Sequence, residues 1–534
     1  MSQWKNTWIP NAATIVVVAA VLLLIPWLGL TLFNSKGEPR EAIVAVSILQ
    51  SGDWILPVNY GDDIPFKPPF LAWCIAVFAK IFNGGTVNEF LSRLPSALAA
   101  LGMIMAGYKW AEKARGVRFA MIFSFVTLTS VEVFRAAVAC RLDMVLTACM
   151  VTALYMLYTL AESKVRRRGL WYAGVVILLT CATLTKGPVG ALLPCLIAGI
   201  YMLLRGKRFF PTFFTLLVIA LLSMVLPAWW AVEAYSRGGE HFYELMMEEN
   251  IGRLTGTMSY DSHIKPWWYN FLTLAAGLLP WTLLLFAACF GRRRNYGTCK
   301  VSPAALFSIV AAVVTVLFYT IPASKRSVYL LPAYPFICYG IAHIIDNTDR
   351  RTAIRFFTWF MAVLAIIVPP AVIWLSISPL PSLPMDSMPW WGYAIIIIPL
   401  LPAVSWCVNR HSPVAHTFAI VWSLYLVYAA AVMPAVLNPK SDYRLIPALG
   451  AAPDTEILSL APDKAYRFFT INYYMDNRLR LAKDIDDAAT HPAGTILLVP
   501  AECDTAGLGK YFDYRPLTAR SCDFRHAAGI AIKR

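Results

Sequence analysis

Long apolar runs recur along most of this chain, and they restrict its fold more than any other feature. A helix needs about 20 apolar residues to cross a bilayer. Runs near that length fall at residues 12–33, 91–108, 119–134, 144–161, 170–185, 188–204, 212–232, 268–290, 303–321, 328–345, 356–377, 390–408 and 417–438. Only 14% of the 534 residues are charged, which is too few to cover a soluble protein of this length. The sequence therefore predicts a polytopic α-helical membrane protein with about thirteen transmembrane helices.

Two segments near the start of the chain differ from the other apolar runs. The run 12–33 is longer than the core of a signal peptide, which has about 7–15 residues, and no small-residue cleavage site follows it. We expect it to remain as the first span. The segment 68–83 is shorter and interrupted, which predicts a helix that lies at the membrane interface.

Basic residues are concentrated in alternate loops between the apolar runs, as the positive-inside rule describes. The formal net charge of +15 is spread over these short clusters, so it forms no single patch of the kind that binds nucleic acid. The basic loops contain Lys109, Lys113, Arg115, Arg118, Lys164, Arg166, Arg167, Arg168, Arg205, Lys207, Arg208, Arg292, Arg293, Arg294, Lys300, Arg350, Arg351, Arg355 and Arg410. The sequence predicts a bacterial inner-membrane protein with a cytoplasmic N-terminus and a periplasmic C-terminus.

The composition becomes polar after about residue 438. We expect a transmembrane domain over residues 1–438 and a small periplasmic α/β domain over residues 439–534. The main outer loops of the first domain are expected at 34–90 and 233–267. The expected strands and helices of the second domain lie at 456–460, 478–484 and 495–500, and at 463–476 and 484–491.

The expected C-terminal domain contains two cysteines, Cys503 and Cys522. In an oxidising periplasm they can form a disulfide that closes a loop of about 20 residues, worth about 3 kcal/mol in the chain-entropy model. The alternative is two unpaired thiols, and the sequence leaves both open.

Ionisable residues gather in the expected outer loops and at the outer ends of spans, where they are costly unless paired or hydrated. The candidates for a site are Glu38, Arg40, Lys67, Arg141, Asp143, Lys186, Glu249, Asn250, Arg253, Lys325 and Arg326. A single cation near a span end is usually an interfacial anchor. Glu41, Asp53, Asp62 and Asp63 are expected to be solvated loop charges. Glu38 and Asp143 stand out, because a carboxylate at a span end gains nothing from anchoring.

Together these residue types fit glycosyl transfer from a lipid phosphate. Lys or Arg can offset the charge that develops on a polyprenyl phosphate as it leaves the sugar. A carboxylate can accept the proton of the attacking hydroxyl. A nucleotide-sugar enzyme would need a soluble cytoplasmic domain, which the sequence does not contain. The sequence therefore predicts a membrane glycosyltransferase of the inverting type with a carboxylate base.

The segment GEPREAIVAVSILQSGDWILPVNYGDDIPFKPP closely follows the pattern (D)ExR…SGDWIVP…(E)KP. In this pattern the chain resembles the bacterial members of the protein O-mannosyltransferase superfamily, especially the aminoarabinose transferases that modify lipid A. The resemblance covers nearly the whole chain. It implies the GT-C fold with thirteen spans, a periplasmic C-terminal domain, a polyprenyl-phosphate sugar donor, and a lipid A, glycan or protein acceptor.

The resemblance also assigns roles to residues at matching positions. Glu38 and Asp143 match acidic positions and are the candidate catalytic residues. Glu249, Asn250 and Arg253 match an E-[HN]-x-x-R segment that forms a substrate loop. The residues expected to bind the donor phosphate are Arg40, Lys67, Lys186, Lys325, Arg326 and Tyr329.

The chain departs from the aminoarabinose transferases at three positions. Gly37 replaces the aspartate that often precedes the loop glutamate, which makes Glu38 the candidate base. Phe66 and Asn250 replace a glutamate and a histidine that look like zinc ligands in that subgroup. We therefore expect no metal ligands at these positions and assign no cofactor, although the chemistry is compatible with a divalent metal.

Two other functions are compatible with part of this pattern, and Gly37 in place of the expected acid also leaves a non-catalytic scaffold open. A lipid-linked sugar transporter or flippase would place charges near the membrane midplane and often has inverted repeats. An O-antigen ligase or polymerase uses a similar donor, but it usually lacks the ExR…KPP combination and the C-terminal domain. The charges at outer span ends favour the glycosyltransferase.

Overall fold

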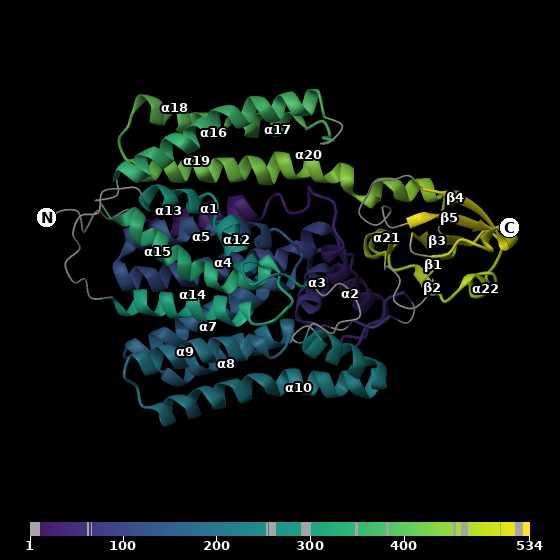
Figure 1. The fold of residues 1–534 in the computed structure, drawn as a ribbon, viewed down its shortest axis with the longest axis horizontal. Helices are drawn as coiled ribbons and strands as arrows, with labels where there is room; N and C mark the ends of the chain where they lie inside the picture. Colours follow the sequence, from purple (N-terminus) through teal and green to yellow (C-terminus); the bar gives the residue numbers. More distant parts are fainter. Residues whose placement is uncertain are drawn as a thin grey trace.

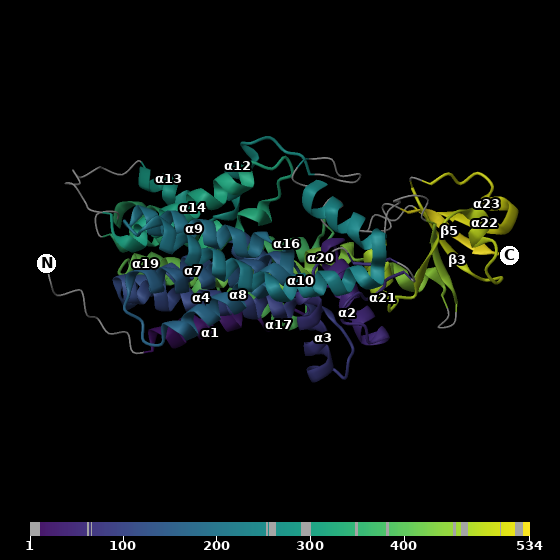
Figure 2. The same cartoon turned by 90° about the horizontal axis from the view of Figure 1, so that it is seen from below.

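A bundle of long helices carries a small β-sheet at one end in a computed structural model of the chain (Figure 1). The structure describes residues 11–534 except 61–62, 66, 253–254, 256–262, 290–300, 348–350, 381–383, 452–454, 461–467, 502 and 518–526. The sheet with the C-terminus lies at one end of the long axis of the molecule (Figures 1 and 2).

Nine helical segments among the described residues are long and apolar enough to cross a membrane. Most of them leave part of their surface exposed, as helices that face lipid do. They are α4 (Glu89–Arg115), α7 (Leu142–Glu162), α8 (Arg168–Lys186), α10 (Phe209–Met247), α14 (Pro303–Thr320), η2 with α15 (Ser327–Ala333 and Tyr334–Asp346), α16 (Arg351–Ile377), α17 with α18 (Trp390–Ile397 and Leu400–Val408), and α19 to η5 (Pro413–Val427, η4 Tyr428–Val432, α20 Met433–Leu437 and η5 Asn438–Lys440).

The remaining four predicted runs are also helical. Two of them form the shorter apolar helices α1 (Ala12–Leu24) and α9 (Val189–Leu204). The other two are bent pairs, namely α5 with α6 (Val117–Leu128 and Val131–Ala137) and α12 with α13 (Tyr269–Gly277 and Trp281–Cys289). Counting each bent pair as one span gives up to 11 spans by length and composition. The predicted polytopic helical fold is confirmed.

The two bent pairs differ from the straight spans that the sequence predicts. They bend by 70° at Thr129–Ser130 and by 102° before Trp281. The hydroxyls of Thr129 and Ser130 donate to carbonyls four residues earlier, a pattern that often bends helices. The two breaks are also joined by a hydrogen bond, in which the Val131 N–H donates to the Leu279 carbonyl at 3.0 Å. Backbone groups that leave a helix at membrane depth need such partners.

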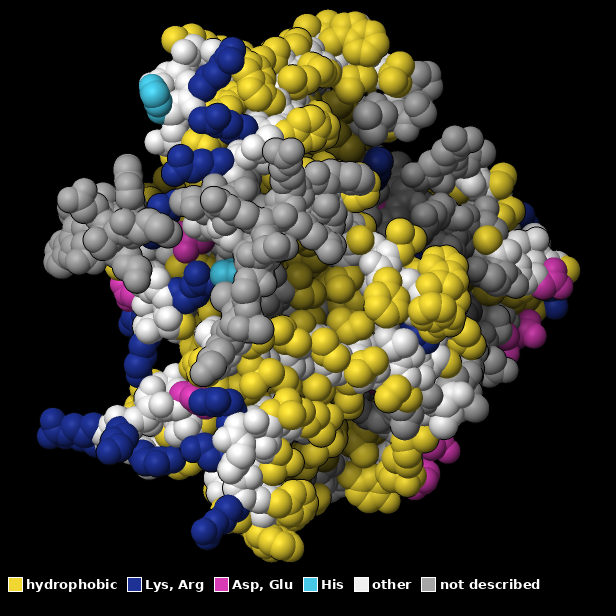
Figure 3. Space-filling view, turned by 60° about the vertical axis from the view of Figure 1, so that its left-hand side comes forward, with side chains coloured by type: hydrophobic (Ala, Val, Ile, Leu, Met, Phe, Trp, Pro, Cys, Tyr) yellow, Lys and Arg dark blue, Asp and Glu magenta, His cyan; other side chains and the backbone are white. Residues whose placement is uncertain are grey.

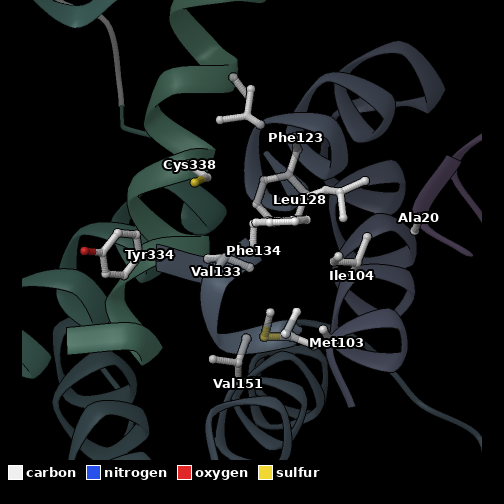
Figure 4. Close-up of a cluster of buried hydrophobic side chains, with 14 of the residues drawn as sticks. Ala20, Met103, Ile104, Phe123, Leu128, Val133, Phe134, Val151, Tyr334 and Cys338 are labelled. Carbon is white, nitrogen blue, oxygen red and sulfur yellow. The ribbon is translucent and has the colours of Figure 1, made fainter. Parts of the chain in front are cut away.

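The core of the bundle is formed by apolar side chains from most of its helices, and Figure 4 shows part of it. Lipid tails are as apolar as these side chains, so close van der Waals packing supplies much of the helix association. The labelled residues of this core are Ala20, Met103, Ile104, Phe123, Leu128, Val133, Phe134, Val151, Tyr334 and Cys338. The core holds the spans that carry the polar residues described below.

The first outer loop folds into two helices, α2 (Gly37–Ser51) and α3 (Phe70–Phe82). One face of α2 is buried because Ala42, Ile43 and Val46 pack against α3 and α21. The helix expected within 68–83 is confirmed as α3, and its position at the interface stays a prediction. Helix α10 continues past residue 232 to Met247 through a kink at Gly239, whose φ is 56°.

The C-terminal sheet has five strands in the order β2-β1-β3-β5-β4. The three predicted strands are confirmed as β1 (Ile457–Leu460), β2 (Leu479–Ala482) and β3 (Ile496–Pro500), which pair in parallel. Two further strands, β4 (Phe512–Pro516) and β5 (Ala527–Lys533), add antiparallel pairs. Short helices connect them, namely η6 (Asp442–Leu449), α21 (Phe469–Tyr474), α22 (Ile485–Ala488) and α23 (Leu508–Tyr511).

Helix α21 contacts α2 and joins the sheet to the bundle. The Tyr474 hydroxyl accepts from the Phe33 N–H at 2.8 Å and donates to Glu89 Oε1 at 2.7 Å. Asn477 Nδ2 donates to Ser47 Oγ on α2 at 3.0 Å. The C-terminal residues therefore help to hold α2, which carries part of the site.

Candidate active site

Helix α2 lies toward the end of the bundle that carries the sheet (Figure 1). A cleft lies beside this helix. Its empty volume is about 500 Å³, and its walls are formed by α2, α3, the start of α7, α21 and the described residues between Asn59 and Pro69. The lining includes four charged residues and several apolar ones, among them Arg40, Glu41, Asp63, Lys67 and Phe469. Such a lining suits a ligand with both a charged group and an apolar part.

Local sequence explains how these side chains reach the cleft. Pro39 lies in the first turn of α2, where its missing N–H costs nothing. Arg40, Glu41 and Val44 then lie on one side of that helix and line the cleft. Lys67 precedes Pro68 and Pro69, whose restricted backbone leads into α3.

Glu41 lies between two cations in the cleft. Its Oε1 accepts from Lys67 Nζ at 2.7 Å and from Arg40 Nη2 at 2.8 Å. The residue is only 9% exposed. The prediction that Glu41 is a solvated loop charge is wrong, because this part of the loop forms a helix that packs beneath the segment carrying Lys67.

Charge and burial both act on the titration of this cluster. Burial raises the pKa of Glu41, but the charges and hydrogen bonds of Lys67 and Arg40 outweigh it and lower the pKa to about 2. Burial and the charge of Arg40 lower the pKa of Lys67 to about 8, against the opposing charges of Glu41 and Glu249. At neutral pH Glu41 is ionised and Lys67 is mostly protonated.

A second ion pair adjoins the cleft. Lys186, the last residue of α8, places Nζ 2.5 Å from Oδ1 of Asp143, in the first turn of α7. The same Nζ lies 4.2 Å from the centroid of the Tyr329 ring. The charge of Lys67 also acts on Asp143. The structure thus brings Asp143, Lys186 and Tyr329 together beside Lys67.

Glu38 is held in a buried ion pair. Arg93 donates to both of its carboxylate oxygens, from Nε at 2.8 Å and Nη2 at 3.0 Å, and the Cys140 N–H donates at 2.9 Å. Burial raises the pKa of Glu38, but the Arg93 charge and these hydrogen bonds give a net lowering. Glu38 is not among the residues that line the cleft. Its catalytic role stays a prediction.

The other predicted donor-binding residues have different surroundings. Lys325 is 5% exposed, and its Nζ donates to the Pro322 carbonyl at 2.7 Å. Arg326 contacts the His263 ring. In the predicted substrate loop, the charge of Glu249 acts on Lys67. The side chain of Asn250 and the whole of Arg253 lie outside the described residues, as do Asp62, Phe66 and Cys522.

Comparisons of sequence relate the chain to known glycosyltransferases. Residues 66–230 match the family described as dolichyl-phosphate-mannose-protein mannosyltransferase. An uncharacterized protein of Aquifex aeolicus is 27% identical over 69% of this chain and 73% of its own length. The undecaprenyl phosphate-alpha-4-amino-4-deoxy-L-arabinose arabinosyl transferase of Pectobacterium atrosepticum is 27% identical over 65% of this chain. That match spans 62% of the Pectobacterium protein.

Comparison of structures extends over nearly the whole chain. The crystal structure of ArnT from Cupriavidus metallidurans bound to undecaprenyl phosphate is similar with a TM-score of 0.73 and 20% identity, covering 97% of each chain. Its apo form gives a TM-score of 0.74 at 19% identity, covering 98% of this chain and 97% of ArnT. The chain therefore has the same fold as ArnT. These comparisons support the resemblance that was seen in the first outer loop.

Sequence reasoning missed two ion pairs of this GT-C chain. One is the pair of Arg93 with Glu38. The sequence could have revealed this pair, because Arg93 lies inside a predicted span, where an arginine needs an acidic partner. The other joins Arg135 Nη2 to Glu132 Oε1 at 2.6 Å on α6. Arg135 also donates to Ser327 Oγ at 3.3 Å. The bend before α6, which the sequence did not reveal, sets the position of this pair.

The site offers more cationic groups than metal ligands. In the part of the chain that the structure describes, no three His, Cys, Asp or Glu side chains gather as a metal site requires. The groups that could hold an anionic ligand are Lys67 and Arg40 in the cleft and Lys186 next to it. These residue types suit the phosphate of a lipid carrier.

Proposed function

We propose that the chain transfers a sugar from a polyprenyl-phosphate donor to an acceptor on the periplasmic side of a bacterial inner membrane. The observation that carries this proposal is the cleft in which Lys67 and Arg40 face a partly apolar wall. A lipid phosphate needs such cations next to a surface for its tail. The names of the relatives support the same donor class, since one of them transfers an amino sugar from undecaprenyl phosphate.

Lys67 and Arg40 would bind the donor phosphate. Both already hold a carboxylate oxygen within 2.8 Å, so their donors are directed at an oxyanion before the donor arrives. As the bond from the sugar to the phosphate breaks, negative charge grows on the phosphate, and the two cations stabilise it. Such preorganised donors contribute more in the transition state than in the ground state.

Lys186, which belongs to the second ion pair, would also help to stabilise the negative charge on the donor phosphate. Its position over the Tyr329 ring and next to Asp143 fixes its ammonium group near the cleft. Lys325 and Arg326 would act less directly, because Lys325 donates to a backbone carbonyl and Arg326 contacts His263. The acceptor would be lipid A, another glycan or a protein.

The proposed orientation follows from the distribution of charge. Figure 3 shows dark blue Lys and Arg side chains near the end of the bundle that lies away from the sheet, beside a largely yellow flank. The positive-inside rule places that end in the cytoplasm. The cleft lies toward the other end, where a periplasmic acceptor can reach it.

Two measurements test the proposed function. Mass spectrometry of lipid A, glycans and secreted proteins from a deletion strain should find one glycoconjugate that has lost a sugar. The purified full-length protein in nanodiscs should bind undecaprenyl phosphate, and Lys67→Ala should weaken this binding at least tenfold, a value that corresponds to about 1.4 kcal/mol. The control Lys80→Ala removes an exposed lysine of α3 outside the cleft and should leave binding unchanged. An unchanged set of glycoconjugates together with no carrier binding would overturn the proposal.

A further inference from the structure

Three of the carboxylates near the candidate site, Glu38, Glu41 and Asp143, differ in how many of their oxygens already accept hydrogen bonds. Both oxygens of Glu38 accept hydrogen bonds, and Arg93 covers them. Asp143 is bonded through Oδ1 to Lys186, and it does not line the cleft. Glu41 lines the cleft and uses only Oε1 for its two cations. A general base needs an oxygen that a substrate proton can reach.

The second oxygen of Glu41 is the relevant atom. Among the described residues no hydrogen bond to Glu41 Oε2 is found, although the side chain is largely buried. Glu41 Oε2 is not one of the fully buried side-chain atoms that lack a partner, so water or a ligand in the cleft can reach it. Because Glu41 lines an open cleft of about 500 Å³, a substrate hydroxyl can supply that partner.

We infer that Glu41 is the general base of the proposed glycosyl transfer, with Arg40 and Lys67 as the groups that bring the donor phosphate next to it. This inference rests on the proposed function and gives it a catalytic residue that sequence reasoning treated as a solvated charge. Arg40 and Lys67 both contact the Glu41 carboxylate. The base and the phosphate that leaves would therefore occupy adjacent parts of the same cleft.

The reaction step is balanced by these groups. The acceptor oxygen forms a bond to the anomeric carbon while the bond from that carbon to the phosphate oxygen breaks. The electron pair leaves with the polyprenyl phosphate, and the acceptor proton passes to Glu41 Oε2. Attack opposite to the leaving group inverts the anomeric configuration.

Donor binding would also activate the base. Before the donor binds, Lys67 and Arg40 hold the pKa of Glu41 at about 2, which makes it a weak proton acceptor. A bound phosphate competes for the same cations, and their withdrawal leaves a buried carboxylate whose pKa rises. Glu41 would therefore become an effective base only after the donor has bound.

The test compares Glu41→Gln with two carboxylate controls. Membranes of the deletion strain that carry each variant are assayed for the rate of glycoconjugate formation, and purified full-length variants are assayed for binding of undecaprenyl phosphate. Glu41→Gln should lower turnover by about 10²–10⁴-fold. It should bind the carrier as tightly as the wild type or severalfold more tightly, because a negative charge next to the phosphate is removed. Glu162→Gln and Asp513→Asn, at ion-paired carboxylates that do not line the cleft, should retain most of the turnover.

A variant that keeps the carboxylate separates catalysis from folding. Glu41→Asp should be clearly more active than Glu41→Gln, with thermal unfolding of both variants measured for comparison. Equal activity of these two variants, or weaker carrier binding by Glu41→Gln, would show a structural role and overturn the inference. An inactive Asp143→Asn variant beside an active Glu41→Gln variant would overturn it as well. In all these cases wild-type transfer still supports the proposed function, whereas a wild type without transfer or carrier binding overturns both.

Discussion

The ion pairs of single residues decide which charges are available for chemistry. Glu38 and Glu41 are three positions apart on α2, yet Glu38 is held by Arg93 and Glu41 by Lys67 and Arg40. The partner of Glu38 comes from the second predicted span, 55 residues later in the chain. A sequence shows that both residues are acidic, but it does not show which distant cation reaches which carboxylate. The candidate residues were therefore predictable as a group, and their individual surroundings were not.

The pKa of Lys67 leads to a pH-dependent prediction. A phosphate binds the protonated amine, and the pKa of about 8 means that the protonated form is lost as the pH rises through that value. Between pH 7 and pH 9 its fraction falls about tenfold, so the apparent affinity for undecaprenyl phosphate should fall by up to about tenfold. Lys67→Arg keeps its charge over this range and should show a nearly flat profile. Parallel profiles for the wild type and Lys67→Arg, measured by titration in nanodiscs, would contradict this assignment.

Helices and strands were predictable from sequence where a local hydrophobic pattern determines them. They were less predictable where contacts with distant parts of the chain determine the structure. Each of the thirteen apolar runs is helical, because hydrophobic length alone selects a helix in a bilayer. The bends before α6 and α13 depend on partners from each other, such as the Leu279 carbonyl for the Val131 N–H. The strands β4 and β5 are missing from the prediction because Phe512–Pro516 and Ala527–Lys533 contain polar or small residues.

The junction between α21 and the bundle can be tested with one hydroxyl. Tyr474→Phe removes the partner of the Phe33 N–H and of Glu89 Oε1, and lost hydrogen bonds of this kind cost about 1–3 kcal/mol. The variant should have a lower midpoint of thermal unfolding and weaker carrier binding, because Phe469 on the same helix lines the cleft. Tyr443→Phe is the matched control, since its ring packs on Tyr474 at 5.0 Å and its hydroxyl has no hydrogen bond within the described residues. Equal unfolding midpoints for the two variants would show that the junction does not depend on Tyr474.

At the scale of the whole molecule, the two ends of the bundle differ in charge and in what they carry. The sheet lies at one end (Figure 1), and the helix α2, which lines the cleft, lies toward it. Whether Cys503 and Cys522 form a disulfide, which the sequence leaves open, is not tested, because Cys522 lies outside the described residues. The domain boundary at residue 438 also stays a prediction, although α20 ends at Leu437 and the sheet begins at Ile457.

Topology is the whole-molecule property on which the proposed function depends most. If the basic loops face the cytoplasm, reporter fusions after Arg168, Arg294 and Arg351 should be active as cytoplasmic reporters. Fusions after Asp63, Gly256 and Arg534 should instead report the periplasm. The physical reason is that loops rich in Lys and Arg are retained on the cytoplasmic side, so every odd-numbered crossing leads outward. The measurement pairs an alkaline phosphatase fusion, active only in the periplasm, with a fluorescent protein fusion, active in the cytoplasm, at each of the six positions. Two or more reversed sites would place the cleft in the cytoplasm, where a periplasmic acceptor could not reach Glu41 or Lys67.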